Sequence, residues 1–355
     1  MAALAEQADA LAALNISDDA AGAAAAQGEP AAASDAADDA DYDSMTAGPM
    51  VAILVGMAGS GKTTLFHRLH YYAEQAAATK KRCYFINLAR GRDPAAIDCP
   101  IEPHIDIRDT VDYKGVMREY SLGPNGAIVT ALNLFATQFA DVMKILEKRA
   151  KEFDYIIVDT PGQIEAFTWS ASGQLFAESL ASTFATTVVY VVDTPRTLGP
   201  ATFMSNMVYA CSILHKLRLP LIAAFNKVDV ESAETCFSWM DDFEKFHEAL
   251  DADSTARESE AGGYITSLHR SMSLVLDEFY RVLTRVPVSA ATGGGIPELF
   301  EKIDGARALY NDTYGAEIRI RLDRHAAMTD EERSDGLRRF EADYEPPEGP
   351  ITGGM

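Results

Sequence analysis

A glycine-rich segment from Gly56 to Thr63 reads GMAGSGKT and fits the pattern GxxxxGK[ST]. It lies between an apolar run and a stretch with helical spacing, the setting that this pattern requires. The glycines let backbone N–H groups fold around phosphate oxygens, and the positive end of the next helix faces the same anion. Lys62 can reach the β- and γ-phosphates. We expect phosphate contacts from Gly56, Ala58, Gly59, Ser60, Gly61, Lys62, Thr63 and Thr64.

A second motif, DTPGQ from Asp159 to Gln163, follows the apolar run Tyr155–Val158. A carboxylate at the end of such a strand is where a nucleotide-bound Mg²⁺ needs an acidic partner, usually through water. The Thr63 hydroxyl can bind the same ion. Thr63 and Asp159 are therefore the expected metal site.

The rest of this motif predicts a switch loop. Gly162 offers a flexible backbone N–H that could touch the γ-phosphate and move when that group leaves. Gln163 either orients the attacking water or makes a structural hydrogen bond, and the residues leave both roles open. Glu165 is a weaker catalytic candidate.

A third motif, NKVD from Asn226 to Asp229, follows the apolar run Leu221–Phe225 and predicts the base. Guanine presents N1–H and N2–H₂ as adjacent donors, and the carboxylate of Asp229 can accept both. Asn226 is expected to tie the loops together, with the stem of Lys227 over the base.

Ser289 and Ala290 follow the last apolar run and fit the backbone contact expected at guanine O6. The order phosphate loop, DTPG, NKVD and SA is that of a GTPase. An ATPase of the carrier type would share the first two motifs. It has no reason for Asp229, because adenine would leave that buried charge unpaired.

These motifs need a scaffold, and short apolar runs that alternate with helical spacing supply one. Segments 131–148 and 201–217 are expected helices. The alternation predicts an α/β fold with a doubly wound, mostly parallel sheet of the P-loop NTPase type, which binds ligands beyond the carboxyl ends of its strands. The expected strands are Met50–Val55, Cys83–Leu88, Tyr155–Val158, Thr187–Val192, Leu221–Phe225 and Val286–Val288.

We expect three parts along the chain. Residues 1–47 hold ten acidic residues and no Lys or Arg, which is typical of a disordered, Ala-rich tail. Residues 48–315 form the nucleotide-binding domain, with a helical insertion at about 237–285 around an acidic, Gly-containing break at 251–263. Residues 316–355 are expected to form a charged helix and a loose C-terminal tail.

The net charge of −22 disfavours direct binding to nucleic acid or to an anionic membrane, since both attract clustered Lys and Arg. No run reaches the roughly 18 apolar residues that a membrane helix needs. The four cysteines form no CxxC pair, which disfavours a zinc or redox site. We expect a cytoplasmic protein with no membrane partner.

The segment Ser121–Gly126, which reads SLGPNG, carries a family resemblance together with other blocks along the chain. Between about residues 48 and 310 the sequence resembles the GPN-loop GTPases, and is similar to their eukaryotic first member, which is linked to RNA polymerase II assembly and nuclear import. The other blocks are DIRDTV (106–111), LNLFAT (132–137), FTWSASG (167–173) and SMSLVLDEFY (271–280).

The resemblance implies a homodimer, or a heterodimer with a paralogous GPN-loop GTPase, that binds GTP or GDP and Mg²⁺. In such a dimer Asn125 reaches towards the γ-phosphate of the other subunit. Pro124 fixes φ, so we expect Asn125 at a rigid turn tip, before a helix that starts near Thr130. Its neutral amide would donate a hydrogen bond to phosphate or orient a water, a role that an arginine has in other GTPases. RNA polymerase II subunits as partners, and shuttling to the nucleus, are also implied.

One departure from the family concerns Asp93. The family has a compact NLDPA, whose Asp helps to position the attacking water. Here Asn87–Ala95 has four extra residues, Ala89 to Arg92. A shift of about 1 Å in such a group can cost on the order of 100-fold in rate. Either hydrolysis is impaired, or the added arginines change the loop usefully, or the insertion is an artefact of the gene model.

Asp106 and Asp109 are candidates for water or metal contacts, and helix capping is the alternative. Arg108 is expected to form an ion pair with a neighbouring carboxylate. These residues lie in the segment that resembles a switch.

Two functions from different classes fit these observations. The first is a GTP-hydrolysing dimeric switch that serves RNA polymerase II assembly and import, with its client surface on the helical insertion. The second is a GTP-stabilised assembly scaffold with negligible turnover, which the added residues before Asp93 favour slightly.

Overall fold

The computed structural model describes residues 48–75, 81–89, 103–256, 262–317 and 320. The expectations for the N-terminal tail (1–47), for Asp93 and for the C-terminal segment from 321 onwards lie outside these residues. So do Arg90 to Arg92 of the added loop.

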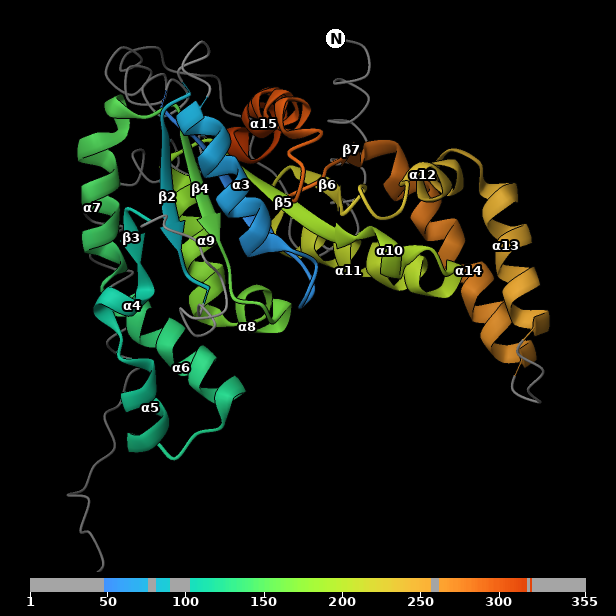
Figure 1. The fold of residues 1–355 in the computed structure, drawn as a ribbon, viewed down its shortest axis with the longest axis horizontal. Coiled ribbons are helices and arrows are strands. Elements are labelled where there is room, and N and C mark those ends of the chain that lie inside the picture. The colour runs from blue at the N-terminus through green and yellow to red at the C-terminus, as the bar shows by residue number, and fades with distance from the viewer. Residues whose placement is uncertain (1–47, 76–80, 90–102, 257–261, 318–319, 321–355) are drawn as a thin grey trace, which may run out of the picture.

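A seven-stranded parallel sheet forms the centre of the fold, which confirms the predicted α/β class (Figure 1). Its strand order is β3-β2-β4-β1-β5-β6-β7. All residues of β1, β4, β5 and β6 are buried, as expected when helices cover both faces of a parallel sheet. The strands are β1 Met50–Val55, β2 Cys83–Asn87, β3 Ile105–Asp106, β4 Tyr155–Asp159, β5 Thr186–Asp193, β6 Leu221–Asn226 and β7 Thr284–Pro287.

The strand β3 was not predicted. It pairs two residues with the end of β2, Ile86 with Ile105 and Asn87 with Asp106. Two residues are too few to show an apolar run, so only the pairing with β2 reveals this strand. At the opposite edge, Pro287 ends β7, where a missing N–H costs no ladder bond.

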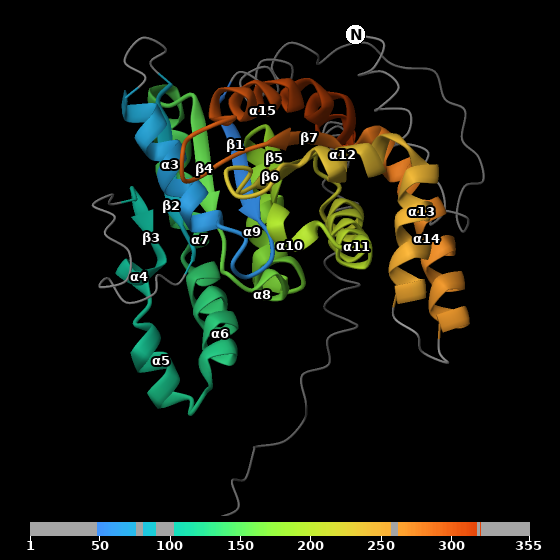
Figure 2. The ribbon, with the colours of Figure 1, turned by 45° about the vertical axis from the view of Figure 1, so that its right-hand side comes forward.

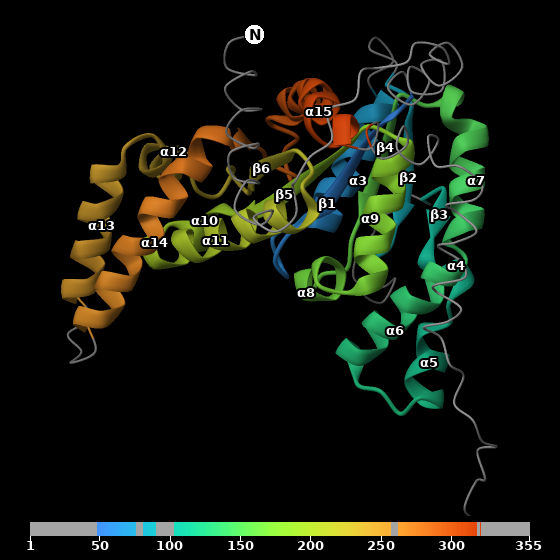
Figure 3. The same cartoon turned by 180° about the vertical axis from the view of Figure 1, so that it is seen from behind.

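Helices cover both faces of the sheet (Figures 1 and 3). On one face α3 and α15 lie side by side, with the rings of Tyr72 and Phe300 stacked 5.7 Å apart. On the other face α9 packs against the sheet at β1, and Figure 3 shows it on the near side of the strands. The helices named here and below include α3 Lys62–Gln75, α4 Ile107–Thr110, α5 Tyr113–Glu119, α6 Pro124–Thr137, α7 Phe139–Arg149, α8 Ile164–Thr168, α9 Ala171–Thr183, α10 Thr194–Thr197, α11 Pro200–Leu217 and α15 Ile296–Tyr310. A short 3₁₀ helix forms at Ala150–Glu152 and a short π-helix at Asn311–Gly315.

The single helix predicted for 131–148 is wrong, because the chain forms α6 and α7 with a break at Gln138. The bend of 60° lets Phe135 and Phe139 both pack on Phe176 of α9, at centroid distances of 6.3 and 4.3 Å. Apolar spacing continues through the break, so the pattern alone hides it. In the described part of the chain no single helix has the length and apolar content of a membrane span. There, only α6 and α7 taken together, across their bend, reach that length and apolar content.

The helical insertion contains three helices, α12 Glu234–Asp241, α13 Phe243–Ala256 and α14 Gly262–Val282, where two were predicted. The predicted break at 251–263 is too wide, since α13 continues through Asp251 to Ala256 and α14 begins at Gly262. Asp242 separates α12 from α13, and its Oδ1 accepts from the N–H of Glu244 at 3.1 Å. The pair α13 and α14 projects away from the sheet (Figures 1 and 3).

The contact between α8 and α9 generates a prediction about stability. An ideal Cβ on Gly173 would lie 2.1 Å from the carbonyl oxygen of Phe167, so Gly173→Ala forces the backbone apart. We expect it to reduce the free energy of unfolding by about 1–3 kcal/mol, measured by chemical denaturation. The control is Gly305→Ala in α15, where a Cβ meets nothing within 4 Å. This control should gain about 0.5–1 kcal/mol, and equal losses in both variants would contradict the packing argument.

Candidate nucleotide-binding site

The predicted motifs meet at the carboxyl edge of the sheet, because parallel strands all end there. The phosphate loop joins β1 to α3, DTPGQ follows β4, NKVD begins at the end of β6, and Ser289 and Ala290 follow β7. Two glycines of the phosphate loop lie too close to other elements for a side chain. A Cβ on Gly56 would meet the carbonyl oxygen of Val191 at 2.5 Å, and one on Gly61, where φ is +92°, would meet Nδ2 of Asn226 at 2.4 Å.

Lys62 is buried under the phosphate loop. Its Nζ donates to the carbonyl oxygens of Gly56 at 2.7 Å and Met57 at 3.0 Å. Burial lowers the pKa of Lys62 and raises that of Asp159, while the charge of each opposes the shift of the other. The pair therefore balances two desolvated charges at the place where phosphates are expected.

Asp159 has the geometry expected of a magnesium partner. The Oγ1 of Thr63 donates to its Oδ2 at 2.8 Å. Its Oδ1 is buried and has no hydrogen-bond partner among the described residues. A hard cation held with phosphate oxygens and water would satisfy this oxygen, so Thr63 and Asp159 fit Mg²⁺. The ion would supply charge neutralisation at the phosphates.

Asn226 connects the phosphate loop to the loop after β7, as the sequence predicted. Its Nδ2 donates to the carbonyl oxygen of Ser60 at 2.9 Å, and its Oδ1 accepts from the N–H of Ala290 at 3.0 Å. Lys227, with φ at +68°, donates from Nζ to the carbonyl oxygen of Gly59 at 2.9 Å. The position of its stem relative to a base stays a prediction.

Asp229 is oriented by Ser289, whose Oγ donates to its Oδ1 at 2.6 Å. The same hydroxyl accepts from the N–H of Thr292 at 3.1 Å. In the part of the chain that the structure describes, Oδ2 of Asp229 has no hydrogen-bond partner. The carboxylate thus has a free oxygen to offer to a base.

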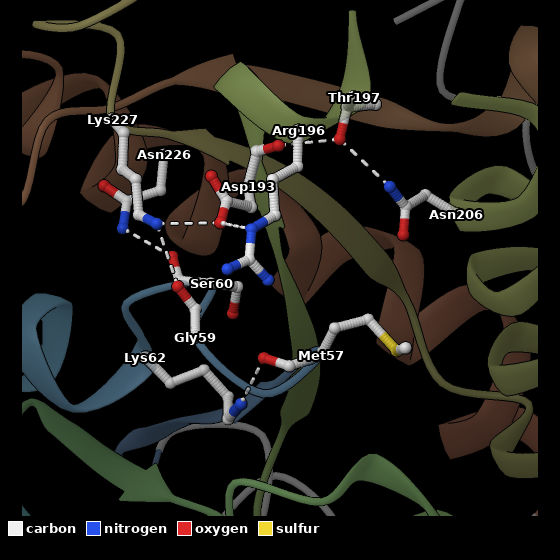
Figure 4. Close-up of polar contacts among 10 residues, drawn as sticks. All are labelled: Met57, Gly59, Ser60, Lys62, Asp193, Arg196, Thr197, Asn206, Asn226 and Lys227. Carbon is white, nitrogen blue, oxygen red and sulfur yellow. Dashed lines mark hydrogen bonds and ion pairs between the residues drawn. The ribbon is translucent and has the colours of Figure 1, made fainter. Parts of the chain in front are cut away.

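Sequence reasoning missed two residues that support the site. Arg68 of α3 donates to the carbonyl oxygens of Ala290, at 2.8 Å, and Ala291, and so anchors the loop after β7. No motif marks it. Asp193 ends β5 and accepts from Nζ of Lys227 at 2.7 Å (Figure 4). It could have been found, since it ends an apolar run just as Asp159 does.

Asp106 caps a helix, which was the alternative to a water or metal contact, and the ion pair expected for Arg108 is confirmed. Its carboxylate accepts from the N–H of Arg108 at 2.8 Å and pairs with the Arg108 guanidinium at 2.6 Å. Asn87 donates a further bond at 2.9 Å. Burial alone would raise the pKa of Asp106, but these hydrogen bonds hold it below its usual value. Asp109 has no ligand role that the described contacts reveal.

The prediction that Asn125 stands at a turn tip is wrong. The helix α6 begins at Pro124 rather than near Thr130, so Asn125 lies in its first turn, after Gly123 as the N-terminal cap. Proline is favoured at this first helical position because its missing N–H would be unpaired anyway. The Oδ1 of Asn125 accepts from Nε2 of Gln163 at 2.6 Å.

The remaining expected contacts lie around this edge. Gly162 has open space around it, and Glu165 is exposed in the first turn of α8. Ala58, Gly59 and Thr64 are exposed at the phosphate loop. The structure therefore places Gln163 beside Asn125 and Glu165 at the surface.

Comparison with known proteins gives consistent matches. A family model described as a conserved hypothetical ATP binding protein matches residues 54–308. The GPN-loop GTPase 1 of Dictyostelium discoideum is 53% identical over 272 residues, which span 76% of this chain and 64% of that protein. The GPN-loop GTPase 1 of Saccharomyces cerevisiae is 49% identical over 267 residues, 75% of this chain and 68% of that protein.

A solved structure agrees with these relatives. The crystal structure of a GTPase from Pyrococcus abyssi in its apo form aligns with a TM-score of 0.60 and 29% identity, over 72% of this chain and 97% of that one. The parallel sheet and the phosphate loop, together with close relatives that are named GTPases, define a P-loop GTPase. More particularly, the chain belongs to the GPN-loop GTPase family.

The base contact yields a prediction about specificity. Asp229→Asn removes a charged acceptor for the two guanine donors, so GTP should bind about 10- to 100-fold more weakly, while ATP affinity should not fall. Competition binding with GTP and ATP measures this. The control is Asp141→Asn, which removes an exposed charge on α7 paired with Lys144. Unchanged GTP affinity in Asp229→Asn would remove the base assignment.

Proposed function

We propose that this protein is a Mg²⁺-dependent, GTP-hydrolysing switch that works as a homodimer or as a heterodimer with a paralogue. The observation that carries this proposal is the 2.6 Å hydrogen bond from Gln163 to Asn125. It joins the GPN segment to the loop that follows Asp159. A change at the phosphates can therefore reach the GPN segment through a few residues of backbone.

The loop after Asp159 has the properties of a switch. At its start, Oγ1 of Thr160 donates to the carbonyl oxygen of Leu54 at 2.7 Å, which anchors the loop to β1. Two residues later, a Cβ on Gly162 would meet nothing within 4 Å. A loop that is fixed at one end and open beyond it can reorder when a γ-phosphate arrives or leaves.

Exposed apolar side chains on the neighbouring helices α6, α8 and α9 support pairing with a second chain. Val129 and Leu134 of α6 are 36% and 37% exposed, and Trp169 and Leu175 at α8 and α9 are 43% and 51% exposed. Figure 2 shows α6 and α8 on the same side of the molecule, at the carboxyl edge of the sheet. Apolar side chains left exposed on adjacent helices favour association with a self-complementary surface.

The orientation of Asn125 suits action across such an interface. Because its Oδ1 accepts from Gln163, its Nδ2 points its two donors elsewhere, and the described residues offer them no acceptor. Donors are the groups that a phosphate oxygen needs. We propose that they meet the γ-phosphate in the other subunit, with Gln163 holding the amide.

The cellular role in this proposal comes from the family resemblance. The protein acts in the cytoplasm as an assembly and import factor for RNA polymerase II and shuttles to the nucleus. The projecting pair α13 and α14 is its client surface, and Val275 on α14 is 65% exposed there.

Mixed dimers test action in trans. We expect Asn125→Ala and Lys62→Ala each to lose GTPase activity, for lack of a γ-phosphate donor and of phosphate binding respectively. Mixing the two should restore some turnover, because one site then has an intact phosphate loop and an intact partner Asn125. Steady-state phosphate release measures this, with subunit exchange followed by labelled chains. Mixed dimers that form without regaining turnover would contradict action in trans, and slow turnover unaffected by Asn125→Ala would favour the scaffold function.

Nucleotide-dependent client binding tests the cellular role. Purified RNA polymerase II subunits should bind about 10-fold differently to the chain loaded with a non-hydrolysable GTP analogue and with GDP, a typical coupling strength. Val275→Asp should weaken this binding, while Ile145→Asp on α7, also exposed, should not. Equal binding in both nucleotide states would contradict a switch.

A further inference from the structure

Arg196 stands at the outer rim of the phosphate loop, on the short helix α10 after β5. Its Nη1 lies 3.7 Å from the position that a Cβ on Gly59 would occupy. The side chain is 72% exposed. Figure 4 shows its guanidinium directed towards the phosphate loop. An exposed arginine is free to point into solvent, so this direction calls for a cause.

Asp193 holds the guanidinium in this place. Its Oδ2 pairs with Nε of Arg196 at 3.4 Å and accepts from Nζ of Lys227 at 2.7 Å. Lys227 also donates to the carbonyl oxygen of Gly59 at 2.9 Å. One carboxylate, only 9% exposed, therefore places two cations next to the same residue of the phosphate loop.

The turn that carries Arg196 is itself anchored. Oγ1 of Thr197 donates to the carbonyl oxygen of Asp193 at 2.7 Å, and Nδ2 of Asn206 on α11 donates to Oγ1 of Thr197 at 2.9 Å (Figure 4). The base of the arginine side chain is thus fixed relative to β5. A pre-positioned cation loses less entropy when it binds an anion.

The local charge favours an anionic ligand. In a chain of net charge −22, this corner holds three cations, Lys62, Lys227 and Arg196, and the two carboxylates of Asp159 and Asp193. The pair between Arg196 and Asp193 is long, uses one nitrogen, and is open to solvent, so it orients the guanidinium but adds little to folding stability. Among the described residues, Nη1 and Nη2 of Arg196 have no hydrogen-bond partner.

We propose that Arg196 is a phosphate-binding residue of this site. Its free Nη atoms donate hydrogen bonds to the phosphate oxygens of the guanine nucleotide held in the phosphate loop of the same chain. A planar fork with two free nitrogens matches a phosphate group. Asp193 is the positioning residue, because it fixes the opposite edge of the guanidinium. The cation comes from the chain itself and adds to the contacts of Lys62.

The test compares nucleotide affinities of the full chain with Mg²⁺. Arg196→Ala should bind GTP about 10-fold more weakly or worse, the scale of a charge-assisted hydrogen bond. Guanosine, which has no phosphate, should compete equally well for both proteins. Arg196→Lys should recover part of the GTP affinity, because it keeps the charge and loses the fork. Equal losses for GTP and guanosine, or GTP affinity within 2-fold of the unmodified chain, would overturn the proposal.

Two further variants complete the design. Arg281→Ala removes an arginine of similar exposure, 67%, that pairs with Asp277 and Glu278 on α14, and it should leave GTP affinity unchanged. In an Asp193→Asn background the effect of Arg196→Ala should shrink, whereas full additivity would overturn the positioning role of Asp193. Failure of the unmodified chain to bind GTP would count against the GTPase assignment instead, so the two failures are distinguishable.

Discussion

The geometry of the site depends on the side-chain amide of Asn226. This amide forms hydrogen bonds with Ser60 in the phosphate loop and with Ala290 in the loop after β7, and it is almost fully buried. A buried amide with both ends satisfied is worth more than a surface contact, because an unpaired end would cost its desolvation. The distance between the loop that binds phosphates and the carboxylate of Asp229 is therefore set by one residue at the end of β6.

Burial at the sheet edge creates the electrostatics of the site. Burial desolvates both Lys62 and Asp159, and the charge of each stabilises the charged form of the other. The same arrangement occurs twice in the site: a carboxylate at the end of a strand interacts with nearby Lys or Arg side chains. Asp159 ends β4 and Asp193 ends β5, and Asp193 forms ion pairs with Lys227 and Arg196. A strongly acidic chain can in this way present a local surface that attracts phosphate.

The same edge links the nucleotide to the outside of the molecule. The loop after Asp159 is anchored at Thr160, open at Gly162 and bonded through Gln163 to the first turn of α6. The sharp bend after α6 keeps this helix on the core while its first turn stays exposed. The structure thus gives the GPN segment a rigid base and a direct contact with the segment expected to sense the γ-phosphate.

The amino-acid sequence alone determined the α/β class, six of the seven strands and the residues of the three nucleotide motifs. It could do so because phosphate, metal and guanine contacts need particular residue types at short, fixed spacings after a strand. Tertiary structure decided the rest: the two-residue strand β3, the break at Gln138, the helical position of Asn125, and the roles of Arg68, Asp193 and Arg196. These features arise where segments distant in the chain pack together, and packing of that kind leaves no local spacing to recognise.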